Sequence, residues 1–87
     1  RLAFPPLTAE RRKEYVKMVK ELAEEARIVV RQHRRSARHD LEGMEKDGEI
    51  SSDEVDRAEK ELEKVTAGHV SAIDTALEHK ERELLGD

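Results

Sequence analysis

The sequence predicts an all-α fold, a long antiparallel hairpin of two helices. Two long stretches without an interior proline each repeat apolar or small residues about every 3.6 positions, which is the period of a nearly straight α-helix. A short segment with turn and helix-start signals lies between them. Because so short a connection makes consecutive helices antiparallel neighbours, the chain is expected to form a rod.

The first seven residues precede any helix signal. Pro5 and Pro6 lack backbone N–H groups, and each forces the residue before it out of the helical conformation. Residues 1–7, with Phe4, Pro5 and Pro6 at their centre, are therefore predicted to be an extended hinge or linker rather than part of a helix.

The first helix is expected over residues 8–46. Thr8 supplies a hydroxyl for the N-cap, and Glu10 places a negative charge beside the positive end of the helix dipole. One face carries the apolar or small residues, interrupted by one histidine. This predicted stripe comprises Tyr15, Val19, Leu22, Ala26, Val29, His33, Ala37, Leu41 and Met44.

Residues 47–51 are expected to form the turn, where Gly48 adopts a positive φ at low cost. Ser51 and Glu54 have the spacing of a capping box, in which each side chain bonds to the backbone N–H of the other residue. The second helix is thus predicted over residues 52–85. Its stripe comprises Val55, Ala58, Leu62, Val65, His69, Ile73, Ala76 and Leu84.

Both stripes are too broad to be covered by the opposite helix alone, because further apolar side chains flank them. These flanking residues are Val16, Val30, Val70 and Leu77. We therefore expect a third apolar surface to complete a bundle. Since the chain also lacks an initial methionine, it is interpreted as part of a longer protein.

Composition excludes several classes of protein. The chain has no cysteine, which excludes a disulfide scaffold, a thiolate metal site and a cysteine nucleophile. The apolar run 28–30 is far too short to span a membrane, so a soluble, intracellular protein with no membrane partner is expected. No glycine-rich phosphate loop or nucleophile motif is present. We predict that the protein is not an enzyme and binds no cofactor.

The four histidines do not have the spacing of a metal site, since no two stand four residues apart on one helix. His33 and His69 fall on the two apolar stripes, where a packed imidazole with one hydrogen-bonded nitrogen is expected. His39 and His79 are predicted to be exposed. No metal site is predicted.

The charges are distributed unevenly along the chain. Residues 1–48 hold 12 basic and 9 acidic side chains, a net charge of +3, whereas residues 49–87 hold 5 basic and 12 acidic side chains, a net charge of −7. The segment 27–38 contains five arginines and no acid. A polyanion is therefore expected to bind the first half of the chain.

The cations of the first helix fall on one side of it. At 100° per residue, six of them lie within roughly 60° of one another, on a line about 120° from the predicted apolar stripe. These residues are Lys13, Lys20, Arg27, Arg31, Arg34 and Arg38, here called the cationic ridge. A straight row of cations suits the backbone of RNA, whose deep, narrow major groove leaves shape and phosphate as the readable features. Alternatively, these side chains solvate the helix and pair with Glu24 or Glu42.

Four segments in the same order resemble a known family. PPLTAERR at 5–12, VRQHRR at 30–35, GEIS at 48–51 and HKERELL at 79–85 are together similar to the C-terminal half of bacterial ribosome recycling factor. The similarity runs without gaps along the chain.

The resemblance implies an L-shaped protein with a three-helix bundle and a small β/α domain, of which this chain supplies the second hinge and two bundle helices. It implies a cytoplasmic, non-catalytic factor that binds large-subunit ribosomal RNA. With elongation factor G and GTP, such a factor splits post-termination ribosomes into subunits for new initiation. The arginines of the family motif fall on Arg31, Arg34 and Arg35. The expected RNA-binding residues are Arg31, Arg34, Arg35, Arg38, Arg27, Lys20 and Lys13.

Three positions depart from the family pattern. Gln32 replaces an asparagine, His33 replaces an aliphatic residue, and Ala9 stands where an acid is common. Without the N-terminal helix of the bundle, the apolar stripe is expected to pair with that helix from another segment or to drive self-association. The alternative function is a protein-interaction hairpin that binds a partner helix through the stripe.

Overall fold

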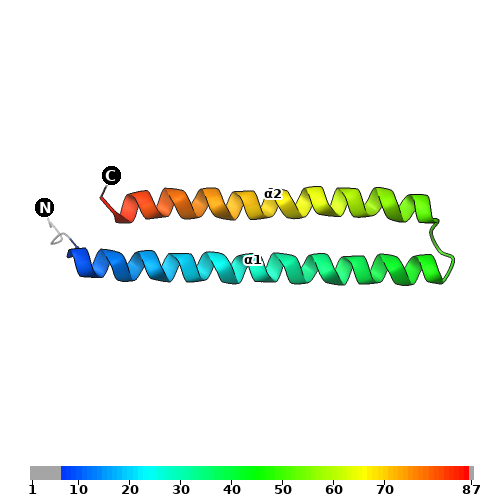
Figure 1. The fold of residues 1–87 in the computed structure, drawn as a ribbon, viewed down its shortest axis with the longest axis horizontal. Helices are drawn as coiled ribbons and strands as arrows, with labels where there is room; N and C mark the ends of the chain where they lie inside the picture. Colours follow the sequence, from blue (N-terminus) through cyan, green and yellow to red (C-terminus); the bar gives the residue numbers. More distant parts are fainter. Residues whose placement is uncertain (1–6, 87) are drawn as a thin grey trace, which may run out of the picture.

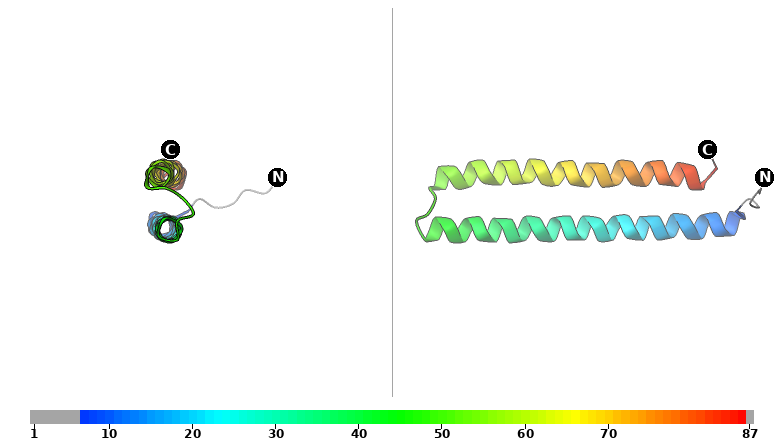
Figure 2. Two further views of the ribbon diagram at one scale, coloured as in Figure 1. Left: turned by 90° about the vertical axis from the view of Figure 1, so that its right-hand side faces the viewer. Right: turned by 180° about the vertical axis from the view of Figure 1, so that it is seen from behind.

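The protein is an extended antiparallel hairpin of two long helices (Figure 1), described from a computed structural model that defines residues 7–86. Helix α1 spans Ala9–Lys46 and helix α2 spans Ser52–Leu84. The molecule measures 66 × 22 × 16 Å, and the two helices run alongside each other in all three views (Figure 2). The predicted all-α hairpin is confirmed.

The observed helix limits lie within one residue of the expected 8–46 and 52–85. The predicted hinge residues Phe4, Pro5 and Pro6 lie outside the described residues. The division of the chain into a hinge segment and a helical domain therefore stays a prediction.

Each helix begins at the predicted cap. The Thr8 hydroxyl accepts a hydrogen bond from the Arg11 backbone N–H at 3.0 Å. Ser51 Oγ accepts one from the Glu54 N–H at 3.1 Å, and Glu54 Oε1 accepts one from the Ser51 N–H at 3.1 Å, which completes the capping box. This backbone hydrogen bond lowers the pKa of Glu54, because it favours the charged carboxylate.

The two helices are joined by a turn at one end of the rod and by a hydrogen bond at the other. At the turn, Gly48 has a φ of 76°, which only glycine adopts without strain. At the open end, Arg12 Nη1 donates a 2.7 Å hydrogen bond to the carbonyl oxygen of Leu84 in the last turn of α2. This contact satisfies one of the free carbonyls at the α2 terminus and joins it to the start of α1.

The seam between the helices is narrow and consists mainly of alanine, valine and leucine side chains. Among the described residues, the buried hydrophobic side chains are those of Ala23 and Val55. The remaining apolar and small seam residues are half-buried. They are Val16, Val19, Ala26, Val30, Ala37 and Leu41 on α1, and Ala58, Leu62, Thr66, Val70, Ile73, Leu77 and Leu84 on α2.

The contact face of each helix lies at a different angle about the helix axis from the predicted apolar stripe. Leu22 is 61% exposed and Val29 is 48% exposed, whereas Ala23 and Val30, which follow them in the sequence, contact the other helix. On α2, Val65 is likewise 48% exposed. The seam on α1 is rotated by roughly 40° from the predicted stripe at 100° per residue. An apolar stripe wider than one partner helix is covered along one edge only, and composition does not indicate which edge.

The uncovered part of the stripes forms a second apolar surface, here called the open apolar face. It carries Leu22, Val29, His33, Val65, His69 and Ala76. Two hollows lie between the helices on this face. One, of about 430 Å³, is lined by His33, Val65 and His69 among others, and the other, of about 300 Å³, includes Leu22 and Ala76. This surface agrees with the expectation that the helices cannot cover both stripes by themselves.

The prediction for His33 and His69 was wrong. Both side chains are exposed rather than packed, because they lie on the open apolar face and not in the seam. Both line the same hollow. His39 and His79 are exposed as predicted, and His79 Nε2 lies 2.7 Å from Glu83 Oε1.

Two neighbouring valines test the position of the seam. Val30→Asp should destabilise the hairpin by about 1–3 kcal/mol, because it places a carboxylate in the half-buried seam. Val29→Asp should change the free energy of unfolding by less than about 0.5 kcal/mol, since this side chain is largely exposed. Urea unfolding of the monomer followed by circular dichroism measures both. Equal effects of the two variants would contradict the assigned seam.

The capping box predicts a pH-dependent contribution to stability. Because the pKa of Glu54 is lower in the folded state, its stabilising effect is present at neutral pH and is lost as the pH falls below the ordinary glutamate value of about 4.3. The melting temperature of wild type should exceed that of Glu54→Gln at pH 7, and the difference should shrink in acid. Glu61→Gln, in the exposed middle of α2, is the control. A difference that is independent of pH would contradict this assignment.

Candidate nucleic-acid interface

The seven cations predicted to bind RNA fall into two groups. Lys13, Lys20, Arg31, Arg35 and Arg38 are exposed. The side chains of Arg27 and Arg34 are only 18% and 29% exposed, because they face α2. Since α1 is continuous from Ala9 to Lys46, the exposed cations share one rigid support.

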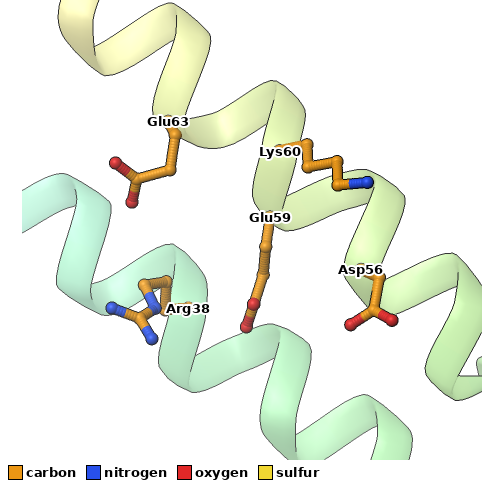
Figure 3. Close-up of a pocket in the computed structure, with 5 residues that line it drawn as sticks. All are labelled: Arg38, Asp56, Glu59, Lys60 and Glu63. Carbon is orange, nitrogen blue, oxygen red and sulfur yellow. The ribbon is translucent and has the colours of Figure 1, made fainter.

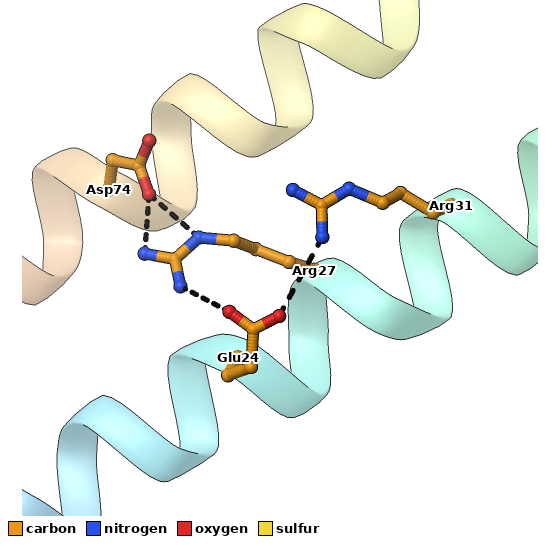
Figure 4. Close-up of polar contacts among 4 residues, drawn as sticks. All are labelled: Glu24, Arg27, Arg31 and Asp74. Carbon is orange, nitrogen blue, oxygen red and sulfur yellow. Dashed lines mark hydrogen bonds and ion pairs between the residues drawn. The ribbon is translucent and has the colours of Figure 1, made fainter.

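Arg27 is held by three hydrogen bonds (Figure 4). Its Nε and Nη2 atoms donate to Asp74 Oδ1 on α2 at 2.9 and 2.6 Å, and its Nη1 donates to Glu24 Oε2 at 3.1 Å. The hydrogen bond to Asp74 raises the pKa of Arg27, although partial desolvation opposes this effect. Each nitrogen of this guanidinium thus has a protein partner, and Arg27 joins the two helices.

Glu24 also contacts the next arginine of the ridge. Its Oε1 lies 3.6 Å from Nη1 of Arg31, whose side chain is 45% exposed, so one carboxylate bridges two arginines (Figure 4). The alternative interpretation, that ridge cations pair with Glu24, is therefore confirmed for Arg27 and Arg31. Within residues 7–86, Glu42 forms no ion pair.

Arg34 pairs with α2 through a single bond. Its Nε donates to Glu63 Oε1 at 2.6 Å, and the Glu63 side chain is 56% exposed. Neither Nη atom of Arg34 has a hydrogen-bond partner among the described residues. Arg34 is therefore anchored at one nitrogen and open at two.

The prediction that the whole ridge faces solvent was wrong for Arg27 and Arg34. The seam lies closer to the ridge than the predicted stripe did, so the ridge residues nearest to it are directed at acids of α2. The predicted exposure is confirmed for Lys13, Lys20, Arg31 and Arg38. Their binding to RNA stays a prediction.

The acids of α2 that border the ridge are a feature that the sequence did not indicate. Arg38 shares a shallow hollow of about 330 Å³ with Lys60 and three acids, Asp56, Glu59 and Glu63, and Glu59 and Glu63 extend from α2 toward α1 (Figure 3). Together with Asp74 these three acids form what we call the acidic edge. A helical wheel places them on one side of α2, but only the register between the helices sets that side against the arginines.

Within residues 7–86, no group of three or more histidine, aspartate or glutamate side chains is placed to hold a metal ion. No helix in this range is sufficiently long and apolar to cross a membrane.

These features define an all-α helical rod, with charged side chains along one side and an open apolar surface along another. The chain matches the family described as ribosome recycling factor over residues 1–85. It belongs to the ribosome recycling factor family, as the resemblance of the four segments indicated.

Individual relatives agree with this assignment. The chain is 53% identical to the ribosome-recycling factor of Acidothermus cellulolyticus, 56% identical to that of Beutenbergia cavernae and 49% identical to that of Streptomyces coelicolor. Each similarity extends over 85 residues, which is 98% of this chain and 46% of the relative. The chain therefore spans about half the length of the relatives it matches.

Proposed function

We propose that this chain forms the RNA-docking part of a ribosome recycling factor and binds large-subunit ribosomal RNA at the intersubunit face through the exposed cations of α1. The observation that carries this proposal is the acid-free segment 27–38, held on one uninterrupted helix. The proposed contacts are made by Lys13, Lys20, Arg31, Arg35 and Arg38, which are exposed, with Arg34 beside them.

The shape of the molecule supports backbone recognition. A rod 66 Å long presents cations over several helical turns, and Lys13 and Lys20, seven residues apart, are separated by about 10 Å along the axis. Phosphates offer a repeated negative charge at any sequence, whereas the bases of an A-form duplex are hidden in its major groove. Arginine's planar fork binds phosphate at two points, so the arginines contribute most of the geometric specificity.

Family membership supports the remaining parts of the proposal. The rod acts in the cytoplasm together with elongation factor G and GTP, and splits post-termination ribosomes into subunits. It contributes position and charge rather than chemistry, since GTP is hydrolysed by the partner. The hinge role of Phe4, Pro5 and Pro6 belongs to this proposal.

The open apolar face supports a second contact. We propose that the N-terminal helix of the same protein packs against this face and completes a three-helix bundle. Leu22, Val29 and Val65, each about half exposed or more, are then buried. In the absence of that helix, self-association covers the same surface.

The alternative function, a hairpin that binds another protein's helix, is favoured by the same face with its two hollows. This function predicts a complex with the partner helix that persists at high salt and does not form with the Val29→Asp variant. Leu62→Asp is not a useful probe, because Leu62 lies in the seam and its loss disrupts the hairpin itself.

RNA docking is tested with purified bacterial large ribosomal subunits at a series of salt concentrations. Arg31→Ala with Arg38→Ala should weaken binding and lower the slope of log affinity against log salt by about 0.7 to 0.9 for each arginine, because each phosphate contact releases counterions.

The matched control is Arg57→Ala with Lys64→Ala, which removes the same charge from exposed positions of α2 outside the ridge. Binding that is independent of salt in wild type, or equal losses in both double variants, would contradict the proposed interface.

A further inference from the structure

We propose that Glu63 is a built-in competitor for RNA phosphate at Arg34, so that docking exchanges a carboxylate of α2 for a phosphate at the same guanidinium. This inference rests on the proposed RNA docking and specifies how the acidic edge controls it.

Two arginines that both face α2 differ in how many hydrogen bonds they make. Arg27 uses all three of its nitrogens in bonds to Asp74 and Glu24, and 18% of its side chain is exposed. Arg34 makes one bond, from Nε to Glu63, and 29% of its side chain is exposed. Arg27 therefore has only two of its five N–H groups left for a ligand, whereas Arg34 retains the four N–H groups of its two Nη atoms without a partner among the described residues.

The competing carboxylate of Glu63 is exposed and weakly held. Glu63 is 56% exposed, and its side chain accepts no hydrogen bond in the described structure except that from Arg34. Ion pairs between exposed side chains are weak, since water screens them and two long side chains are ordered. Glu63 can thus leave Arg34 at low cost when a phosphate takes its place.

The carboxylate of Glu63 and an RNA phosphate are similar hydrogen-bond acceptors for a guanidinium. A carboxylate and a phosphate both present oxygen pairs that fit the guanidinium fork, and both form charge-assisted hydrogen bonds with it. Glu63 therefore holds Arg34 in a position from which the Nη atoms reach an incoming phosphate, but its charge opposes that phosphate until the pair separates.

The neighbouring acids extend this effect. Three acids of α2, Asp56, Glu59 and Glu63, and one cation, Lys60, line the hollow with Arg38 (Figure 3). Because the acids outnumber this cation, a polyanion that contacts Arg38 meets net repulsion from α2 as well as attraction from α1. Such repulsion penalises loose, non-specific binding more than a docked rod with many simultaneous contacts, and it adds selectivity for the correct RNA surface.

The test compares two variants that make the same change in net charge. Glu63→Gln removes the competing charge and retains the size of the side chain, whereas Glu61→Gln removes a charge from an exposed position of α2 without an ion pair in the described structure. Binding of the whole chain to purified large subunits is measured across salt concentrations. Circular dichroism establishes that both variants have wild-type helicity.

Glu63→Gln should bind about two to five times more tightly than Glu61→Gln, the range expected for release of an exposed ion pair. Its salt slope should match that of Glu61→Gln, because once docked both variants make the same phosphate contact at Arg34. In an Arg34→Ala background the two variants should bind equally, which assigns the gain to this pair rather than to general electrostatics.

Failure of the proposed competition and failure of the proposed RNA interface give different results. Equal binding of the two variants, or weaker binding of Glu63→Gln, would overturn the competition while leaving the RNA interface intact. A persistent gain in the Arg34→Ala background would also overturn it. Absence of salt-dependent binding in wild type and in all variants would overturn the proposed function and this inference together.

Discussion

The angle of each helix about its own axis determines which side chains face the other helix and which remain on the surface. Small residues such as Ala23 and Ala26 form much of the seam on α1, and Val30 continues it. Because the helices meet along this narrow line, three surfaces are set by their rotation: the seam, the side that carries the ridge and the acidic edge, and the open apolar face. A change of rotation by one side chain would exchange these assignments.

On the charged side, the cations differ in how far they are paired and exposed. Arg27, with 18% of its side chain exposed, bonds to Asp74 and Glu24 and contributes to holding the hairpin together. Lys13, Lys20 and Arg31 stand further round the helix and remain exposed. Arg34 is intermediate in exposure, and it bonds to one acid. A single row of cations in the sequence therefore becomes a surface in which some members join the two helices and others stay exposed.

On the other side, the same narrow seam leaves much of the apolar stripe uncovered. With Ala23 and Val55 as its buried hydrophobic residues, the described hairpin has a thin core, and long helices gain most of their stability from packing of an apolar face. Covering Leu22, Val29 and Val65 adds buried area along the rod. Covering the open apolar face and docking through the cations are therefore compatible events, because they use opposite sides of the seam.

The local structure follows from the amino-acid sequence alone. The caps at Thr8 and Ser51, the positive φ at Gly48 and the two helices of period 3.6 each depend on residues within one or two turns. The sequence also places the cations on one side of one helix. Which edge of each apolar stripe is covered depends on the packing of the two helices, because a stripe wider than its partner offers several packings of similar hydrophobicity. That choice set the register between the helices, exposed His33 and His69, and placed Glu63 and Asp74 against Arg34 and Arg27, contacts between residues 29 and 47 positions apart in the chain.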